Sequence, residues 1–188
     1  MLEVLEIEQL QTKVAREITS PAQGVVLINC QVVTDETKDE ENEADLSVPL
    51  HWRAGDWSKP PIDIALDADT GQFQSLQLVL QDETIGRTTL LSAEMAASSE
   101  GRPIFARTAW RNDERYIDER LQPTQSWVEH GSLLVVFPLP PVQTTQICQV
   151  DDSLAFLLNE QNEVIGFRLD HITSEEKRTI RWAAPSRT

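Results

Sequence analysis

Two stretches of the chain alternate apolar and polar residues, and each stretch predicts a β-hairpin. In residues 62–80, isoleucine or leucine recurs at every second position, the sequence DADTGQ provides a turn, and leucine alternates again beyond it. Residues 154–172 follow the same plan. A period of two places apolar side chains on one face of a strand and polar side chains on the other. We therefore expect a mainly β fold (α+β), with antiparallel sheets and one or two short helices.

The two predicted hairpins match each other when a one-residue gap is placed in the turn, so that Ile64 aligns with Phe156. Upstream, the sequence GVVLIN from Gly24 matches GSLLVV from Gly131. The interval from this glycine to the hairpin is 38 residues in the first copy and 23 in the second. A duplicated β unit whose first copy holds an acidic insertion explains the pattern. The alternative is that any two half-buried hairpins share such alternation.

The repeat predicts two related β units within one compact globule. Residues 1–86 form the first unit, with the acidic insertion at residues 34–49, and residues 102–188 form the second. Residues 87–101 are expected to form a connecting helix, because good helix formers precede a glycine and a proline that would end it. A short helix is also expected within residues 2–18, where apolar residues recur at offsets of three and four, although the same residues could begin a strand.

Negative charge is abundant and lies mostly in the N-terminal half. The chain holds 31 acidic and 16 basic side chains, for a formal net charge of −15, and residues 1–100 hold 19 and 6 of them. The resulting field repels nucleic acids and anionic membranes and attracts basic proteins. No apolar run reaches the roughly 18 residues of a membrane span, and no secretory signal opens the sequence. We expect a cytoplasmic protein with a basic protein partner, and neither nucleic acid nor a membrane as a partner.

The acidic insertion supplies most of the candidate partner-binding residues. Its carboxylates outnumber a single lysine, and two tryptophans follow in the sequence HWRAGDW. Counter-charges accelerate association with a basic surface, and exposed aromatic residues are common anchors of protein interfaces. The alternative is a solvated loop that only adds solubility. The predicted partner-binding residues are Asp35, Glu36, Asp39, Glu40, Glu41, Glu43, Asp45, Trp52 and Trp57.

No stretch carries a specific catalytic, nucleotide or metal signature, so we expect a binding protein rather than an enzyme, with no metal and no cofactor. Cys30 and Cys148 are expected to be small buried residues, because each lies in an apolar run without a second cysteine nearby. The sequence DADTG resembles part of a calcium loop, but Leu78 stands where that loop needs a glutamate. The same residues favour a simple turn.

Two alternatives to a protein-binding module remain open. One is a homo-oligomeric assembly protein, for example a homodimer joined through exposed hairpin edges. The other is an uncommon enzyme that uses carboxylates with His130 or His171, each of which follows an acidic residue. Glu175 and Lys177 form a pair of the type found in metal-dependent nucleases, with Asp151–Asp152 as the upstream carboxylate, although a strongly anionic nuclease would repel its substrate.

The sequence NEVIGFRLDHI resembles the second strand of a small prokaryotic β-hairpin domain of unknown function. In that domain the pattern D-x-x-G-x-V-V-G-I-E-I-L follows an alternating first strand, and here Asn162 replaces its glycine and Arg168 its glutamate. This resemblance covers the two hairpins and implies no activity. The chain as a whole is similar in character to bacterial immunity proteins, which are small, acidic, cytoplasmic and β-rich. That similarity implies an immunity protein or inhibitor that neutralises a basic, nuclease-like toxin.

Overall fold

The fold is described from a computed structural model, and over the described residues it is mainly β, with antiparallel and mixed sheets and one short helix, as the alternating sequence predicts. The described residues are 1–33, 48–55, 61–81, 86–87, 97–111, 114–121, 124–128, 131–137 and 144–183. The seven acidic residues of the predicted partner-binding set, at positions 35–45, lie outside the described residues, and so does Trp57.

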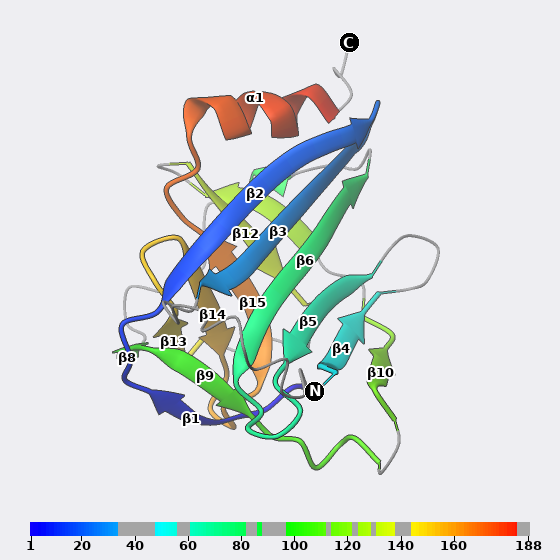
Figure 1. Ribbon diagram of the computed structural model, residues 1–188. Coiled ribbons are helices and arrows are strands. Elements are labelled where there is room, and N and C mark those ends of the chain that lie inside the picture. Colours follow the sequence, from blue (N-terminus) through cyan, green and yellow to red (C-terminus); the bar gives the residue numbers. More distant parts are fainter. Residues whose placement is uncertain are drawn as a thin grey trace, which may run out of the picture.

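Most strands belong to two sheets that face each other as two layers (Figure 1). The first sheet has the order β10-β4-β5-β6-β3-β2 and contains β2 (Lys13–Ala22), β3 (Val25–Val33), β4 (Leu50–Ala54), β5 (Ile62–Leu66), β6 (Phe73–Gln81) and β10 (Tyr116–Glu119). The second sheet has the order β7-β11-β12-β15-β14-β13-β8 and contains β7 (Gly86–Arg87), β8 (Ala97–Glu100), β11 (Thr124–Val128), β12 (Ser132–Val136), β13 (Gln146–Gln149), β14 (Leu154–Leu158) and β15 (Val164–Leu169).

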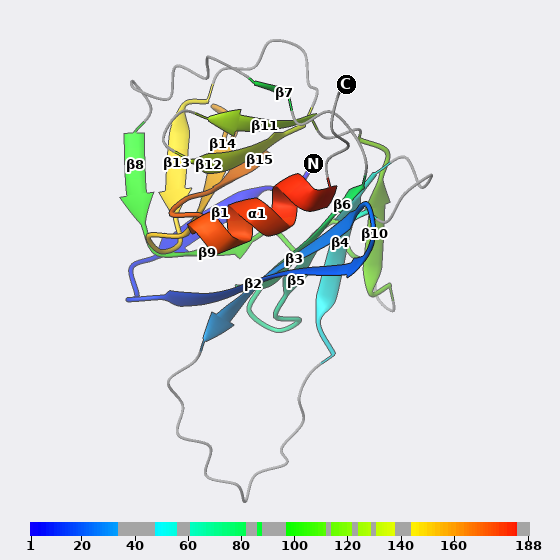
Figure 2. The ribbon, with the colours of Figure 1, turned by 90° about the horizontal axis from the view of Figure 1, so that it is seen from above.

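Two further elements close the space between the layers. A two-stranded ribbon joins β1 (Val4–Glu8) to β9 (Arg102–Phe105). Helix α1 (Ser174–Ala183) lies across one end of the sandwich, over the opening between the sheets, as Figure 2 shows from above.

The two sheets repeat the same strand order. β2 to β6 and β11 to β15 are runs of five consecutive strands, and these runs are arranged as 2-3-6-5-4 and 11-12-15-14-13. In each sheet, a strand from the segment between the two runs extends this order by pairing in parallel, β10 with β4 and β8 with β13. This repeated order is the arrangement that a duplicated β unit would produce.

The pairing registers of the two predicted hairpins also coincide. β5 pairs with β6 so that Ile64 faces Leu76, and β14 pairs with β15 so that Phe156 faces Phe167. Both hairpins have a register irregularity at the equivalent position, just before the turn. The residue-by-residue match between the two hairpins therefore extends from sequence to backbone pairing.

The upstream part of the predicted alignment is wrong by two residues. Ile28 of β3 and Leu133 of β12 face equivalent leucines of β6 and β15, so these two residues correspond to each other. Gly131 then corresponds to Val26 and not to Gly24. Because a displacement of two keeps every side chain on the same face, alternation alone could not detect it.

Each hairpin turn is closed by one side-chain oxygen. Oδ1 of Asp67 accepts the backbone N–H groups two and three residues further along at 3.0 and 2.7 Å, and Oδ1 of Asn159 accepts those two and four residues along at 2.9 Å each. Each turn then places one residue in the left-handed region, Gly71 with φ 77° and Asn162 with φ 59°. Asparagine tolerates this region, so Asn162 can replace the glycine of the hairpin pattern that the second copy resembles.

The β1–β9 ribbon attaches to both hairpin turns. The carbonyl of Leu2 accepts the N–H of Val164, just after the second turn, at 2.8 Å. The N–H of Phe105 donates to the carbonyl of Gly71, in the first turn, at 2.9 Å. Because Val4 pairs with Phe105 across the ribbon, main-chain hydrogen bonds hold the two hairpins at a fixed spacing.

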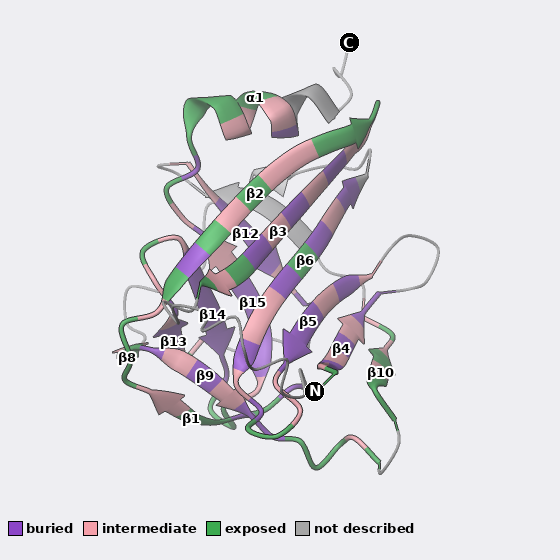
Figure 3. Ribbon diagram, in the orientation of Figure 1, coloured by how far each residue is buried: buried purple, intermediate pink, exposed green. Residues whose placement is uncertain are grey.

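The apolar faces of the two sheets enclose the main core. Phe156 of β14 meets Phe73 and Phe105 edge to face, with ring centroids 5.2 and 5.7 Å apart. Cys30 and Cys148 are buried and free, as predicted, and burial raises the pKa of both thiols to about 12. Figure 3 shows the corresponding alternation of buried and less buried residues along β3 and β6.

The helix expected within residues 2–18 is wrong. These residues form β1 and the first part of β2, and the alternate residues Val14, Arg16 and Ile18 share the face of β2 that turns toward the core. The three-and-four spacing that suggested a helix depended on Leu10, which lies between the two strands and is 52% exposed.

The connecting helix expected over residues 87–101 is wrong at both of its described ends. Arg87 belongs to β7, and the sequence ASSE forms β8, which pairs in parallel with β13. Residues 88–96 lie outside the described residues. Pairing with the edge of an existing sheet outweighs the weak intrinsic helix preference of a four-residue segment.

Helix α1 begins at a capping box that the hydrophobic pattern did not reveal. Oγ1 of Thr173 accepts the N–H of Glu176 at 3.2 Å, and Oε2 of Glu176 accepts the N–H of Thr173 at 2.6 Å. The same carboxylate accepts Nε of Arg16 from β2 at 2.9 Å. Burial would raise the pKa of Glu176, but the hydrogen bonds from Arg16 and Thr173 outweigh burial and lower that pKa.

The carboxylate of Glu176 should make part of the stability depend on pH. Because its pKa is lowered in the folded state, its charge stabilises the fold above the unfolded-state pKa, and this stabilisation disappears as the pH falls through the folded-state pKa. We expect Glu176→Gln to lower the free energy of unfolding by about 1 kcal/mol near pH 7 and by almost nothing in strong acid. Urea unfolding of both proteins across this pH range checks the expectation. Glu175→Gln is the matched control, because Glu175 is exposed and does not pair with Arg16. An equal pH dependence of stability in both variants would contradict the role of the Glu176 carboxylate.

Two glycines with the same backbone angle should respond differently to alanine. Gly24 and Gly71 both have φ +77°, but a Cβ on Gly24 would have no neighbour within 4 Å, whereas one on Gly71 would lie 2.5 Å from the carbonyl oxygen of Phe105. We expect Gly24→Ala to lower the free energy of unfolding by about 1 kcal/mol, the strain of the left-handed region alone. Gly71→Ala should lower the free energy of unfolding by about 1–3 kcal/mol more than Gly24→Ala, because the β1–β9 ribbon must also shift to make room for the Cβ. Denaturant unfolding of both variants measures the difference, and equal losses would show that the ribbon is not fixed to the turn.

Candidate functional site

The outer face of the first sheet is polar and accessible. On each strand, alternate residues point away from the core, and all of these polar side chains are half-buried or exposed (Figure 3). The pairing registers place six of them in one continuous row from β2 to β10, whereas Ala15 and the buried Ala65 interrupt the neighbouring row. We call this surface the open face, and its polar residues are Glu17, Asn29, Gln31, His51, Arg53, Asp63, Ser75, Gln77, Tyr116 and Asp118.

Five of these side chains form a connected group on β4, β5 and β10, which we call the His51 cluster. Nδ1 of His51 lies 2.8 Å from Oδ1 of Asp63, and the ring of Tyr116 stacks on His51 with centroids 5.0 Å apart. The Arg53 guanidinium lies 4.5 Å from the centroid of Tyr116. It also donates to both carboxylate oxygens of Asp118, at 2.7 and 3.0 Å. Tyr116 is 53% exposed, so the cluster presents an aromatic ring to its surroundings.

The strand pairings explain why this cluster assembles. β4 and β10 run in parallel with His51 opposite Tyr116 and Arg53 opposite Asp118, and β5 places Asp63 opposite Arg53 on the other side. Alternation along β4 sends His51 and Arg53 outward together. Residues separated by 60 or more positions in the sequence thus become neighbours through sheet register, which a local motif search cannot detect.

Trp52 does not have the exposed position that was expected of an anchor. It is 1% exposed, its ring packs edge to face against Phe137, and its Nε1 donates to Oε1 of Glu119 at 2.8 Å. Because Trp52 alternates in phase with Leu50 and Ala54, it belongs to the inner face of β4. The expectation that Trp52 binds a partner directly is therefore wrong, and Tyr116 is the exposed aromatic residue of this surface.

The described residues of the predicted enzyme alternatives do not form a metal-binding group. His130 lies outside the described residues, and His171 is exposed, with its carbonyl accepting a hydrogen bond from Arg16. Oδ1 of Asp151 accepts the N–H groups of the turn that begins β14, and its Oδ2 accepts the N–H of Val14 at 2.8 Å. Within the described ranges, no group of three or more histidine, cysteine, aspartate or glutamate side chains is placed to hold a metal ion.

The pair formed by His51 and Asp63 is the geometry that general-base chemistry uses, and sequence reasoning did not single it out. Here, however, Tyr116 covers the imidazole ring. The pair also lies on a sheet face rather than in a hollow, and such a surface suits contact with another protein better than enclosure of a small substrate. Period-two alternation through LHWRA could have identified His51 and Arg53 as outward-facing residues.

The equivalent face of the second sheet is apolar at several positions where the open face is polar. When the two sheets are aligned by their strand pairings, His51 corresponds to Ile147, Asn29 to Leu134 and Asp63 to Ala155. These three apolar residues form a buried cluster together with Leu157 and Ile165. The two β units therefore share a backbone plan and an inner core. Among the described residues, their outer faces differ at these three positions, whereas Gln149 and Arg168 of the second unit are polar like their counterparts Arg53 and Gln77.

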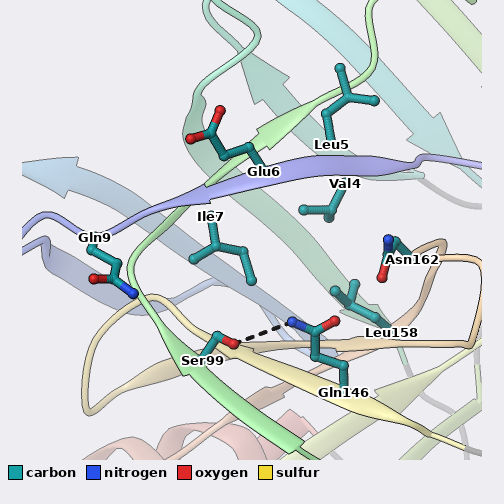
Figure 4. A pocket seen from close by; sticks show the side chains of 9 residues that line it. All are labelled: Val4, Leu5, Glu6, Ile7, Gln9, Ser99, Gln146, Leu158 and Asn162. Atoms are coloured by element: carbon teal, nitrogen blue, oxygen red, sulfur yellow. Dashed lines mark hydrogen bonds between the residues drawn. The ribbon is translucent and has the colours of Figure 1, made fainter.

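Two hollows lie away from the open face. One, of about 210 Å³, separates β1 from the end of the second sheet, and Figure 4 shows the hydrogen bond of 3.3 Å from Gln146 to Ser99 on its wall. Its other polar lining residues are Glu6, Gln9 and Asn162. A second hollow, of about 590 Å³, lies between the β1–β2 connection and the segments at residues 100–101 and 149–152. Neither is lined by the His51 cluster, and neither gathers a catalytic pair.

No helix among the residues that the structure describes is long and apolar enough to cross a membrane. A scan against protein-family models finds no match for this chain, and a search of curated proteins finds no significant relative.

Proposed function

We propose that this chain is an acidic protein-binding module that recognises a basic protein partner through the open face and the acidic segment at residues 34–47. The observation that carries the proposal is the asymmetry between two sheets of the same strand order. At the register positions of His51, Asn29 and Asp63, the first sheet is polar where the second is apolar, and only the first sheet has an acidic segment in the sequence between its strands, joining β3 to β4. Both features belong to the first β unit of the sequence, as a shared role in binding would favour.

Long-range and short-range recognition would then be divided between the two features. Seven carboxylates against one lysine at residues 35–45 give a field that steers a basic partner toward the first sheet. The open face offers amide, carboxylate and guanidinium groups in rows, together with the exposed ring of Tyr116. Tyrosine and arginine are the residues that most often contribute strongly to binding energy at protein interfaces.

A basic, nuclease-like toxin is the partner class that this chemistry suits best. An enzyme that binds a phosphate backbone carries a cationic surface, and a dense carboxylate surface can occupy it in place of nucleic acid. The chain would then act as an immunity protein or inhibitor inside the cell that makes it. A homodimer built through sheet edges is the competing assembly, and light scattering on the purified chain distinguishes a 21.2 kDa monomer from it.

Neutralising the acidic segment should slow association with the partner. We expect that replacing its seven carboxylates by asparagine and glutamine lowers the association rate constant by about tenfold or more at low salt. At high salt the replacement should have little effect, because exposed charges are screened over about 8 Å already at physiological ionic strength. Affinity capture from a lysate of the source organism, followed by surface plasmon resonance with each captured protein, provides the measurement.

An equal-charge control makes this test specific. It neutralises seven exposed carboxylates outside both the acidic segment and the open face, namely Glu3, Glu6, Asp69, Glu100, Asp152, Glu160 and Glu175. This control should keep most of the wild-type association rate if position matters as well as net charge. Capture of a set of proteins with no excess of basic members, or equal slowing in both variants, would contradict the proposal.

Tyr116 should contribute to affinity without contributing much to stability. We expect Tyr116→Ala to weaken binding of the captured partner by about tenfold or more, chiefly through faster dissociation. Leu10→Ala is the matched control, because Leu10 is 52% exposed against 53% for Tyr116 and lies outside the open face. Titration calorimetry with the captured partner gives the affinities, and thermal unfolding confirms that both variants fold. Equal affinity of the two variants would exclude the His51 cluster from the interface.

A further inference from the structure

A third hollow, which the proposed interface does not use, is lined by three arginines. It measures about 250 Å³, lies where the segment between β9 and β10 passes the start of β4, and is lined by Leu50, Ala68, Arg107, Trp110, Arg111, Glu114 and Arg115. Two successive turns explain the spacing of the arginines: the N–H of Trp110 donates to the carbonyl of Arg107 at 3.1 Å, and the N–H of Glu114 to that of Arg111 at 2.7 Å. Residues four positions apart are thereby brought to one hollow.

Two of the arginines are positioned by main-chain carbonyls. Nη1 of Arg107 donates to the carbonyl of Ala68, and Nη1 of Arg115 donates to the carbonyl of Val48 at 3.0 Å. Each bond uses one of the five N–H donors of a guanidinium. Arg111 has no hydrogen-bond or ion-pair partner among the described residues, and is exposed. Among the described residues, each of these three guanidiniums therefore has at most one hydrogen-bond acceptor.

The charge of this hollow is positive, opposite in sign to the net charge of the chain. Acidic residues outnumber basic ones by 31 to 16 in the chain, yet among the described residues that line this hollow three arginines accompany one carboxylate, that of Glu114. Within the described residues, no carboxylate oxygen lies within ion-pair distance of any of the three guanidiniums. Three like charges that share a hollow repel one another, and an anion between them would convert that repulsion into attraction.

We infer that this hollow is a binding site for a small oxyanion. Guanidinium groups match the paired oxygens of phosphate and carboxylate groups with two parallel N–H donors, and such charge-assisted bonds are about twice as strong as neutral ones. The limited volume admits an inorganic anion or the anionic end of a small metabolite. Leu50 and Trp110 line the same hollow and would contact any apolar part of the ligand. The site is independent of the protein-binding proposal.

Titration calorimetry of the full chain with inorganic phosphate, pyrophosphate and succinate, at matched ionic strength, tests this site. Arg111→Ala is the informative variant, because Arg111 forms no described contact that the fold requires, and Arg120→Ala is the matched control, because Arg120 is exposed and does not line the hollow. We expect saturable binding of at least one anion, unchanged in Arg120→Ala and weakened about tenfold or more in Arg111→Ala. Thermal unfolding verifies that both variants are folded.

The three anions also identify the ligand class. Tighter binding of phosphate or pyrophosphate would assign the site to phosphate-bearing ligands, and tighter binding of succinate would assign it to carboxylates; either result supports an oxyanion site. Absence of saturable binding by all three anions, or equal weakening in Arg111→Ala and Arg120→Ala, would overturn the inference. Because none of these measurements involves a protein partner, their failure would leave the function proposed for the open face untouched.

Discussion

Burial of one apolar face from each sheet against the other is the constraint on which this structure depends. Phe156 of the second sheet packs against Phe73 of the first and against Phe105 of the ribbon, so three elements meet around a single ring. A one-residue slip in either hairpin would move its whole inner set of side chains to the opposite face. The β-bulge and the side-chain-closed turn in each hairpin prevent that slip, and the core in turn requires both.

The core constrains the residues on the inner faces of the two sheets, whereas the residues on the outer faces can differ between them. Sheet register gives a direct comparison, because a histidine in β4 occupies the place of an isoleucine in β13, and an aspartate in β5 that of an alanine in β14. In the second sheet, β14 is apolar and buried on both faces, and β15 is so except at the half-buried Arg168. The first sheet contributes its inner face to the same core and presents the polar residues of the open face on its outer side.

The sequence predicts those features that depend on local pattern. Alternation and turn chemistry locate both hairpins, and the buried cysteines follow from their apolar surroundings. Prediction fails where tertiary pairing decides the outcome: ASSE is a strand because β13 offers it an edge, and Tyr116 meets His51 only because β10 pairs in parallel with β4. Trp52 is a different failure, because strict alternation through LHWRA already placed it inside, and the expectation of an exposed anchor overrode that pattern.

The open face and the arginine hollow meet at the start of β4, where the N–H of His51 donates to the carbonyl of Arg115 at 2.8 Å. Arg115 thus contributes its main chain to the strand that carries the His51 cluster and its side chain to the hollow. An anion bound by the Arg115 guanidinium would contact the same residue whose backbone carbonyl accepts the N–H of His51. A ligand can change affinity at another site only as far as it distinguishes two states of the residues that connect them. Here the hydrogen bond between Arg115 and His51 is a direct connection between the two surfaces, so β4 is where such coupling would be sought first.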